Sequence, residues 1–422
     1  MNRSFRFHYG WIIVFVSFTA LLVGNGSRVP FGVFFKPMIG EFGWDRASAS
    51  LAVSIGVLVY GLLQPLMGKA VDHFGARRVV IASTFATGIG TVLIAATSDL
   101  WQLYISYGII ASIGAGGLGF TTLTVLIANW FSTRRGLAMG ISQAGFPASQ
   151  LFMVPLSMFL IVSFGWRMSW AILAILFVTL MLPLSIYLLK GHPADLGLRP
   201  YGSAAAPVSR TGASAPAAGA RREKRTSLTQ AMRTASFWQL AFGYGVCGFT
   251  VSMVTTHLVA YASDVKISEV DAANALGLMG GLNIVGTMLI GALTDRIGNK
   301  NPLAFIYFTR GIAFIILLAV TNVGMLYLFA AVFGFAFLAT VPPTAGLSAD
   351  LYGRGSLGVI YGTVSLSHQT GGAIGAYLAG AIFDTSGSYH VAFVIGTVAC
   401  FAAAAASYTI KEKRVPDAVA AA

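Results

Sequence analysis

The chain has 422 residues, of which 56% are apolar and 10% are charged, and its mean hydropathy is +0.77. About a quarter of the residues of a soluble domain are charged, so this composition excludes an ordinary water-soluble protein and indicates a membrane protein. A formal net charge of +13 would suit a nucleic-acid partner, but the placement of the cations along the chain, given below, excludes that reading.

Apolar stretches follow one another along the chain, each with the roughly 20 residues needed to cross about 30 Å of hydrocarbon. The first is too long for a signal-peptide core and has no small-residue cleavage pattern, so we expect it to remain as an uncleaved span. The sequence predicts an all-α membrane protein of twelve transmembrane helices in two bundles of six. The predicted spans lie near 10–36, 45–70, 77–97, 99–131, 135–163, 167–190, 236–263, 269–294, 301–320, 322–350, 355–384 and 388–410.

A segment of different composition separates the two sets of spans. It contains an Ala, Gly, Ser and Pro tract over 202–220 and a basic cluster over 221–225. Such a segment cannot form a core, so a flexible linker is expected; the alternative is that its basic cluster binds anionic lipid. The predicted division is an N-terminal bundle over 1–190, a cytoplasmic linker over 191–233, and a C-terminal bundle with a short cytoplasmic tail over 234–422.

The distribution of Lys and Arg predicts the orientation. If both termini are cytoplasmic, 21 of the 27 Lys and Arg fall on the cytoplasmic side, as the positive-inside rule requires. Two others, Arg28 and Arg310, lie within spans. The four on the outer side are Lys36, Arg46, Arg167 and Lys266. The positive charge is therefore an insertion signal for a multi-pass protein of the cell inner membrane, which removes the case for nucleic acid.

Other functional classes lack the residues they need. Both cysteines, Cys247 and Cys400, lie inside apolar runs, which favours neither a disulfide nor a metal site. The sequence has no nucleophile–base pair, metal-ligand cluster or phosphate-binding loop. We therefore expect no enzyme activity, no cofactor, no metal and no obligate protein partner.

A short pattern occurs twice, offset by 223 residues, once after the second span and once after the eighth. Its form is G-x3-D-x2-G-x-[RK]. The first copy contains Gly68, Asp72, Gly75, Arg77 and Arg78. The second contains Gly291, Asp295, Arg296, Gly298 and Lys300. Two matches at equivalent places in two six-span halves indicate an internal duplication.

With this repeat, the sequence resembles the major facilitator superfamily, whose signature occupies these two loops. The resemblance implies two six-helix bundles around a central solute pathway and a role for the repeat in gating. Glycines permit a tight turn, an aspartate can face a helix N-terminus, and the basic residues can reach an acidic partner. The alternative is that the basic residues serve only for topology.

Several loop segments resemble the bacterial branch related to monocarboxylate and oxalate carriers, namely 9–11, 34–36, 129–140 and 192–200. Those carriers have an arginine and an aspartate in span eight, but this chain has Thr287 and Asn283 there. Their first-span lysine falls on Val29, next to Arg28. Their anion- and proton-binding residues therefore do not transfer by identity, and a carboxylate site here would use other residues.

Ionisable residues at membrane depth are costly and mark candidate sites. Arg28 lies about 27 Å along the first span at 1.5 Å per residue, with Asn25 on the same face. It can present a planar charged fork to an anion, or it can extend to the outer headgroups. We expect Arg310, in the peripheral span nine, to pack or extend to the headgroups rather than bind substrate.

Further polar residues complete the predicted substrate site. Alignment of the two halves places Thr255 at the depth of Arg28, so His257 of span seven is expected to face Arg28 across the cavity. In span eleven, His368 shares a stripe with Tyr361 and Ser365, and Asn283 lies midway along span eight. Each histidine is equally compatible with a substrate or proton site and with a hydrogen bond between helices.

All 14 Asp and Glu fall in loops or at span ends, so the pathway has fixed positive charge and no fixed negative charge. The sequence therefore predicts a secondary transporter of a small organic anion, a mono- or dicarboxylate, that works by alternating access. Coupling to protons would use His257, His368 or the substrate itself. The alternatives are export of a neutral or amphipathic compound and, with less support, a solute sensor that transports nothing.

Overall fold

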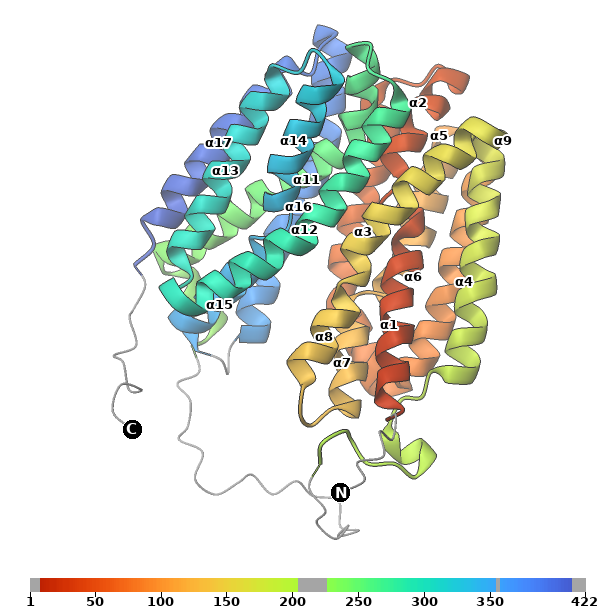
Figure 1. The fold of residues 1–422 in the computed structure, drawn as a ribbon, viewed down its shortest axis with the longest axis vertical. Coiled ribbons are helices and arrows are strands. Elements are labelled where there is room, and N and C mark those ends of the chain that lie inside the picture. Colours follow the sequence, from red (N-terminus) through yellow and green to blue (C-terminus); the bar gives the residue numbers. More distant parts are fainter. Residues whose placement is uncertain (1–7, 204–225, 354–356, 412–422) are drawn as a thin grey trace.

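The computed structural model describes residues 8–203, 226–353 and 357–411. Within these ranges, a few side chains lie outside the description: Ser27, Pro65, Asp72, Arg135, Asp295 and Leu357. The elements of the described residues are helices, joined by short loops and one isolated bridge between Phe131 and Tyr201. Figure 1 shows them as two groups of long helices leaning against each other.

The first group contains the elements up to residue 188. Its helices are α1 (Gly10–Gly24), η1 (Asn25–Ser27), α2 (Phe31–Phe42), α3 (Arg46–Phe74), α4 (Ala76–Ala95), α5 (Leu100–Leu103), η2 (Tyr104–Ala111), α6 (Ser112–Gly117), α7 (Phe120–Trp130), α8 (Arg135–Gln143), α9 (Gly145–Pro183) and η3 (Leu184–Leu188). A short helix, η4 (Pro193–Leu196), follows. We call this group the first set.

The second set begins after the segment that lies outside the description. Its helices are α10 (Leu228–Met232), α11 (Ala235–Asp264), α12 (Glu269–Ile297), α13 (Lys300–Leu318), α14 (Val323–Ala336), α15 (Val341–Tyr352), α16 (Leu357–Ser386) and α17 (His390–Tyr408). The predicted domain boundaries stay a prediction, and residues 204–225 of the predicted linker lie outside the described residues.

These helices form the predicted all-α membrane architecture. Among the described residues, nine helical stretches are long and apolar enough to cross a membrane. One of them, Leu137–Leu188, has 52 residues and turns at Gly165, whose φ of 78° suits only glycine. The first span is broken at η1, and the tenth is divided into α14 and α15. With these breaks, the order of elements is consistent with twelve spans.

The helices run between two ends of the molecule. We call the end where α1 begins and α17 ends the near end, at the bottom of Figure 1, and the opposite end the far end. If the predicted topology is correct, the near end is cytoplasmic. The α2, α9, α11 and α12 helices approach one another at the far end (Figure 1).

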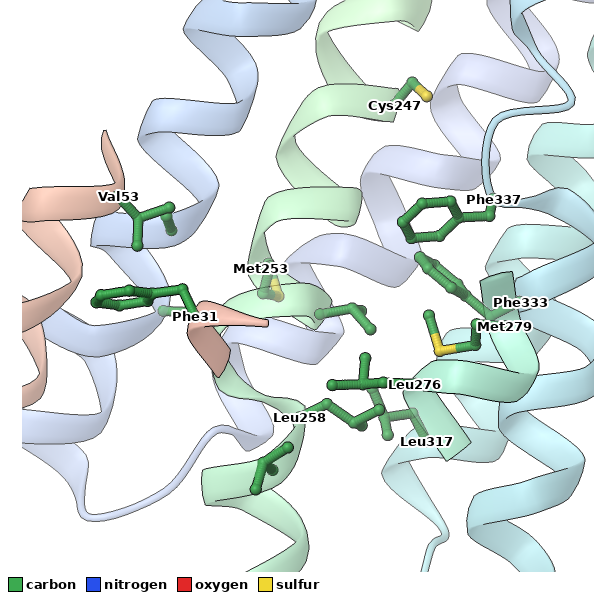
Figure 2. Packing of buried hydrophobic residues seen from close by; sticks show 14 of the residues in the cluster. Phe31, Val53, Cys247, Met253, Leu258, Leu276, Met279, Leu317, Phe333 and Phe337 are labelled. Carbon is green, nitrogen blue, oxygen red and sulfur yellow. The ribbon is translucent and has the colours of Figure 1, made fainter. Parts of the chain in front are cut away.

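The two sets share a hydrophobic core toward the far end. One cluster of buried residues combines Phe31 and Val53 of the first set with Met253 and Met279 of the second, as Figure 2 shows. A separate cluster, which contains Ile13 and other near-end residues, is built from the first set alone. Burial of apolar side chains therefore holds the sets together toward the far end.

Small residues allow the sets to approach closely along this contact. A Cβ added to Gly32 of α2 would overlap the carbonyl oxygen of Thr255 in α11. A Cβ added to Gly380 of α16 would lie 2.7 Å from the carbonyl oxygen of Arg46. Backbone contact of this kind needs glycine, which is the usual way that membrane helices pack tightly.

Two loop segments that carry the sequence resemblance lie together at the near end. The indole of Trp130 donates a hydrogen bond to the carbonyl oxygen of Lys190 over 2.9 Å. The backbone N of Tyr201 donates to the carbonyl oxygen of Trp130 over 2.8 Å. The first part of the predicted linker is therefore docked on the loop that precedes α8.

Candidate functional site

Arg28 lies at the break in the first span, where η1 ends. Its guanidinium carbon is 4.4 Å from the centre of the Tyr60 ring of α3, a distance at which a cation is attracted to the ring face. Its buried Nε has no hydrogen-bond partner. Among the described side chains, no carboxylate forms an ion pair with it. The guanidinium is thus held by an aromatic ring and is not neutralised.

Other polar groups of the first set surround the same ring. Gln64 is one turn beyond Tyr60 on α3, and its Oε1 accepts a hydrogen bond of 2.7 Å from the hydroxyl of Thr121. The buried amide Nε2 of Gln64 has no hydrogen-bond partner. A Cβ on Gly119 would lie 2.9 Å from the Tyr60 hydroxyl and 3.3 Å from this Nε2, so both groups converge on one small space.

The second set contributes an aromatic and histidine cluster. The hydroxyls of Tyr244 and Tyr361 are 3.1 Å apart. The ring of His368 lies 4.8 Å from that of Tyr244, and its buried Nε2 has no hydrogen-bond partner. Ser365 is partly buried on the same stripe of α16. The structure therefore brings Tyr361 and His368 together, as their spacing suggested, and adds Tyr244.

The two clusters lie on helices that touch each other. A Cβ on Gly61 of α3 would lie 2.7 Å from the side chain of Gln369 in α16. Gln64 is one turn from Gly61, and His368 is adjacent to Gln369. The two side chains that each have one unpartnered nitrogen therefore flank one contact between the sets. A solute between the sets could contact both.

His257 forms hydrogen bonds between helices, one of the two roles that the sequence left open for it. Its Nδ1 is 3.0 Å from the Tyr389 hydroxyl and its Nε2 is 2.8 Å from the carbonyl oxygen of Ala376, so both ring nitrogens are occupied. The Phe35 ring packs against it at 5.2 Å. The first-span residue that lies against Thr255 is Gly32, one turn beyond Arg28. A substrate role for His257 stays a prediction.

Asn25 and Asn283 are both buried with their amides engaged. The Asn25 Nδ2 donates to the carbonyl oxygen of Leu21 over 2.9 Å. The Asn283 Oδ1 accepts from the backbone N of Leu338 over 3.0 Å and from the Thr287 hydroxyl over 3.1 Å. Asn283 thus supports the break between α14 and α15 and pairs with Thr287, without any charge.

Arg310 is fully buried at the same break. It donates to the carbonyl oxygens of Ala336 and Phe337, each over 2.6 Å, and to the Thr250 hydroxyl over 3.0 Å. Carbonyls at the C-terminal end of a helix have no partner within the helix, and a cation there is favourable. Two roles were expected for Arg310, packing within the protein or extending to the headgroups. The structure shows the first.

The two copies of the repeat form the same turn. Gly75 and Gly298 end α3 and α12 with φ of 81° and 82°, a conformation that favours glycine. A Cβ on Gly68 would make an ordinary contact of 3.7 Å with the Thr121 side chain, and one on Gly291 would meet nothing within 4 Å. The Arg77 guanidinium donates to the carbonyl oxygen of Ile186 over 2.6 Å.

The basic residues of the repeat differ in their surroundings. Arg78 and Arg296 are exposed, and Lys300 lies 5.2 Å from the centre of the Tyr408 ring. The side chains of Asp72 and Asp295 lie outside the described residues. The gating role of the repeat stays a prediction.

Sequence reasoning missed several polar residues of this region. Tyr60, Gln64 and Tyr244 lie inside apolar runs and carry no charge, so they gave no signal comparable to Arg28. The sequence did contain a signal for them: Tyr60 and Gln64 are four residues apart, which places two polar side chains on one face of the span. The sequence placed Arg46 on the outer side and Asp264, like every Asp and Glu, in a loop or at a span end. That the two form a pair became visible only in the tertiary structure.

Comparison with known proteins agrees with this architecture. The chain is 26% identical over 395 residues to the uncharacterised MFS-type transporter YcxA of Bacillus subtilis (strain 168), covering 90% of each chain. It is 27% identical over 390 residues to monocarboxylate transporter 13 of Bos taurus, covering 92% of this chain and 86% of that protein. These relatives are transporters rather than enzymes.

Solved structures share the fold. A bacterial homologue of the human lysosomal transporter Spinster, in an inward-facing and occupied conformation, superposes with a TM-score of 0.73 at 15% identity, over 95% of this chain and 96% of that one. The family model described as Major Facilitator Superfamily matches residues 11–315 and 240–421. The chain therefore belongs to the Major Facilitator Superfamily and is a multi-pass membrane transporter.

Proposed function

We propose that this transporter moves a small organic anion, a mono- or dicarboxylate, between the two sets of helices by alternating access. The observation that carries the proposal is the state of Arg28. A permanently charged guanidinium at membrane depth is costly unless something compensates its charge. Among the described side chains it packs on the Tyr60 ring, forms no ion pair and has an unpartnered Nε. A carboxylate would supply the missing acceptor and the missing charge.

The surrounding groups suit the rest of such a solute. Gln64 of the first set and His368 of the second each present a buried nitrogen without a partner. A second carboxylate, a keto group or a hydroxyl could accept from Gln64, while the ring of Tyr244 would cover an apolar part. Contact with both sets is what a solute needs in order to couple its binding to movement of the sets.

The relatives add support from another direction. Monocarboxylate transporters 12 and 13 of several vertebrates are among the proteins to which the chain is similar, and their names state their solute. For this chain we propose the inner membrane and cytoplasmic termini, supported by the bias of Lys and Arg, and coupling to protons through His368, His257 or the solute itself.

Uptake into proteoliposomes tests the proposal. Purified protein is reconstituted and supplied with labelled lactate, pyruvate, oxalate or malate, with and without a pH gradient. We expect at least one carboxylate to accumulate and the others to compete. Movement of a neutral solute, with no carboxylate transported or competing, would contradict the proposal and favour the export of neutral compounds.

Substitution of Arg28 gives the matched test. Arg28→Ala should lower transport by about tenfold or more, since hydrogen bonds to charged groups contribute about 1.5–3 kcal/mol. Its melting temperature should stay close to that of the parent. Arg167→Ala is the control, because Arg167 pairs with Glu41 over 2.7 Å away from the site. Near-normal transport by Arg28→Ala would remove Arg28 from the site.

A further inference from the structure

The far end carries a group of charged residues that the proposed site does not use. Arg46 is the first residue of α3, and its guanidinium donates two hydrogen bonds to Asp264 at the end of α11, over 2.7 and 2.9 Å. Only 11% of the Arg46 side chain is exposed. A two-point contact between a guanidinium and a carboxylate is strong and directional. It joins the first set to the second.

A second carboxylate of the second set holds the beginning of α3. Asp384 of α16 accepts hydrogen bonds from the backbone N of Arg46 over 3.0 Å and of Ala47 over 2.7 Å. Asp45, the N-cap residue, accepts from the backbone N of Ser48 over 2.6 Å. The first N–H groups of a helix have no partner within it. Two of those of α3 are thus satisfied by a carboxylate from the other set.

A chain of hydrogen bonds continues from Arg46 into the molecule. Its Nη1 donates to the Tyr389 hydroxyl over 2.7 Å, which lies 3.0 Å from His257 Nδ1. The His257 Nε2 lies 2.8 Å from the carbonyl oxygen of Ala376. A carbonyl only accepts, so Nε2 carries the proton and Nδ1 accepts from Tyr389. A neutral His257 therefore satisfies every bond of the chain.

A separate ion pair reinforces the same end. Lys36 of α2 lies 3.2 Å from Glu269 at the start of α12 and also contacts the Ser263 hydroxyl of α11. Among the described side chains, the hydrogen bonds and ion pairs between the two sets lie at the far end or, for Ser54 with Ala373, toward the middle. The near end of the described chain has none of these connections.

We infer that Arg46, Asp264, Asp384, Tyr389 and His257 form a far-end gate that must open in each transport cycle. Arg46 is the residue on which the two carboxylates and the hydroxyl converge. Tyr389 and His257 are positioning residues, because they act by holding the Arg46 guanidinium against Asp264. This inference depends on the chain being a transporter, not on the identity of the solute.

Alternating access explains why the contacts are arranged in this way. When the far end opens, α3 must leave α11 and α16, and Arg46, Asp264 and Asp384 become hydrated together. Water then forms hydrogen bonds with each charged group in place of those lost with its partner, so the ion pairs can break reversibly. Residues that only stabilised the fold would not need to exchange partners between the sets.

Access of a thiol to water at the far end tests the gate. Val53 is buried on α3 beside Phe31 and Met253 (Figure 2), and Val53→Cys makes it a reporter. The two native cysteines are fully buried, and protein without the reporter gives their background. A membrane-impermeant maleimide is added separately to either face of sealed vesicles without any solute, and the rate of labelling is measured.

Opening of the gate should raise the rate from the far face. For Arg46→Ala we expect a rise of about tenfold or more, since a charge-assisted pair is lost. For Tyr389→Phe, which keeps the ring, we expect about two- to tenfold, as for the loss of one hydrogen bond. Combined with Arg46→Ala, Tyr389→Phe should add nothing, because it acts through Arg46. His257→Phe should behave like Tyr389→Phe.

Arg167→Ala is the matched control, because it breaks an ion pair at the same end but within the first set; it should label at the parent rate. If Arg46→Ala does not fold, Tyr389→Phe and His257→Phe carry the test. The inference is overturned if these variants are labelled at the rate of the parent. It is also overturned if the effects of Tyr389→Phe and Arg46→Ala on the labelling rate multiply, as those of independent sites would. Because no solute is present, failure here is separate from failure of the carboxylate proposal.

Discussion

Two arginines lie at membrane depth in this protein, and their surroundings differ. Arg310 in the second set is fully buried, and its two Nη atoms donate to the carbonyl oxygens of Ala336 and Phe337 and to the Thr250 hydroxyl, whereas its Nε, like that of Arg28, has no partner. Arg28 in the first set is partly buried and has an aromatic ring as its main neighbour. Neither has a carboxylate partner among the described side chains. One charge therefore supports a broken helix, and the other is the one for which we propose an anionic ligand.

The difference teaches how to interpret an intramembrane charge. The cost of burying a cation is met by dipoles in one case, since carbonyls at the end of α14 point at Arg310. The surroundings of Arg28 compensate only part of the cost of burying its charge, which is what a binding site for an anion requires. Substitution of Arg310 should therefore lower the stability of the protein, and substitution of Arg28 should lower transport.

The largest effect should follow the loss of Arg310. Arg310→Ala leaves the carbonyls of Ala336 and Phe337 without partners. We expect a destabilisation of about 2–6 kcal/mol, because each buried group left unsatisfied costs about 1–3 kcal/mol. The variant should express poorly and melt well below the parent in detergent. Thermal unfolding followed by size-exclusion chromatography measures this. A parent-like melting temperature would show that the break does not depend on Arg310.

A smaller effect on a different readout should follow Arg28→Lys. The charge is kept, but an ammonium lacks the planar fork and the flat face that packs on Tyr60. We expect the KM for the carboxylate to rise by about tenfold, which corresponds to about 1.4 kcal/mol, with melting unchanged. If uptake by Arg28→Lys equals that of the parent, then only the charge of Arg28 matters. An unchanged KM together with a lower melting temperature would make Arg28 structural, like Arg310.

The smallest effect should follow Asn283→Ala. Its Oδ1 accepts from the backbone N of Leu338, so loss of that bond should destabilise the protein by about 1 kcal/mol. Transport per folded molecule should stay near normal, because Asn283 and Thr287 satisfy each other without charge. A large loss of uptake at normal stability would instead return Asn283 to the substrate site, where the sequence placed it.

The far and near ends differ in a similar way. At the far end, Arg46 with Asp264 and Lys36 with Glu269 join the two sets. At the near end, the repeat turns at Gly75 and Gly298, and Arg78 and Arg296 are exposed. Among the described side chains, the hydrogen bonds and ion pairs between the sets therefore lie toward the far end, an asymmetry that agrees with the proposed alternating access.

The sequence by itself determined the class of fold, because the length and spacing of apolar stretches follow from the thickness of the bilayer. It also determined the internal repeat, since only glycine adopts the backbone found at Gly75 and Gly298. It selected Arg28 and Arg310 as unusual, because charge at membrane depth is rare. These properties are local or follow from composition, and a single chain displays them.

Only the tertiary structure decided which polar residues meet. Arg28 was expected opposite His257; in the structure its guanidinium lies against Tyr60 on α3, and Phe35 packs against the His257 ring. His257 contacts Tyr389, and Tyr389 contacts Arg46, although the three residues belong to distant segments of the chain. A break of a few residues changes both the depth and the direction of every side chain that follows. For that reason spacing along one helix could not supply the partners across two.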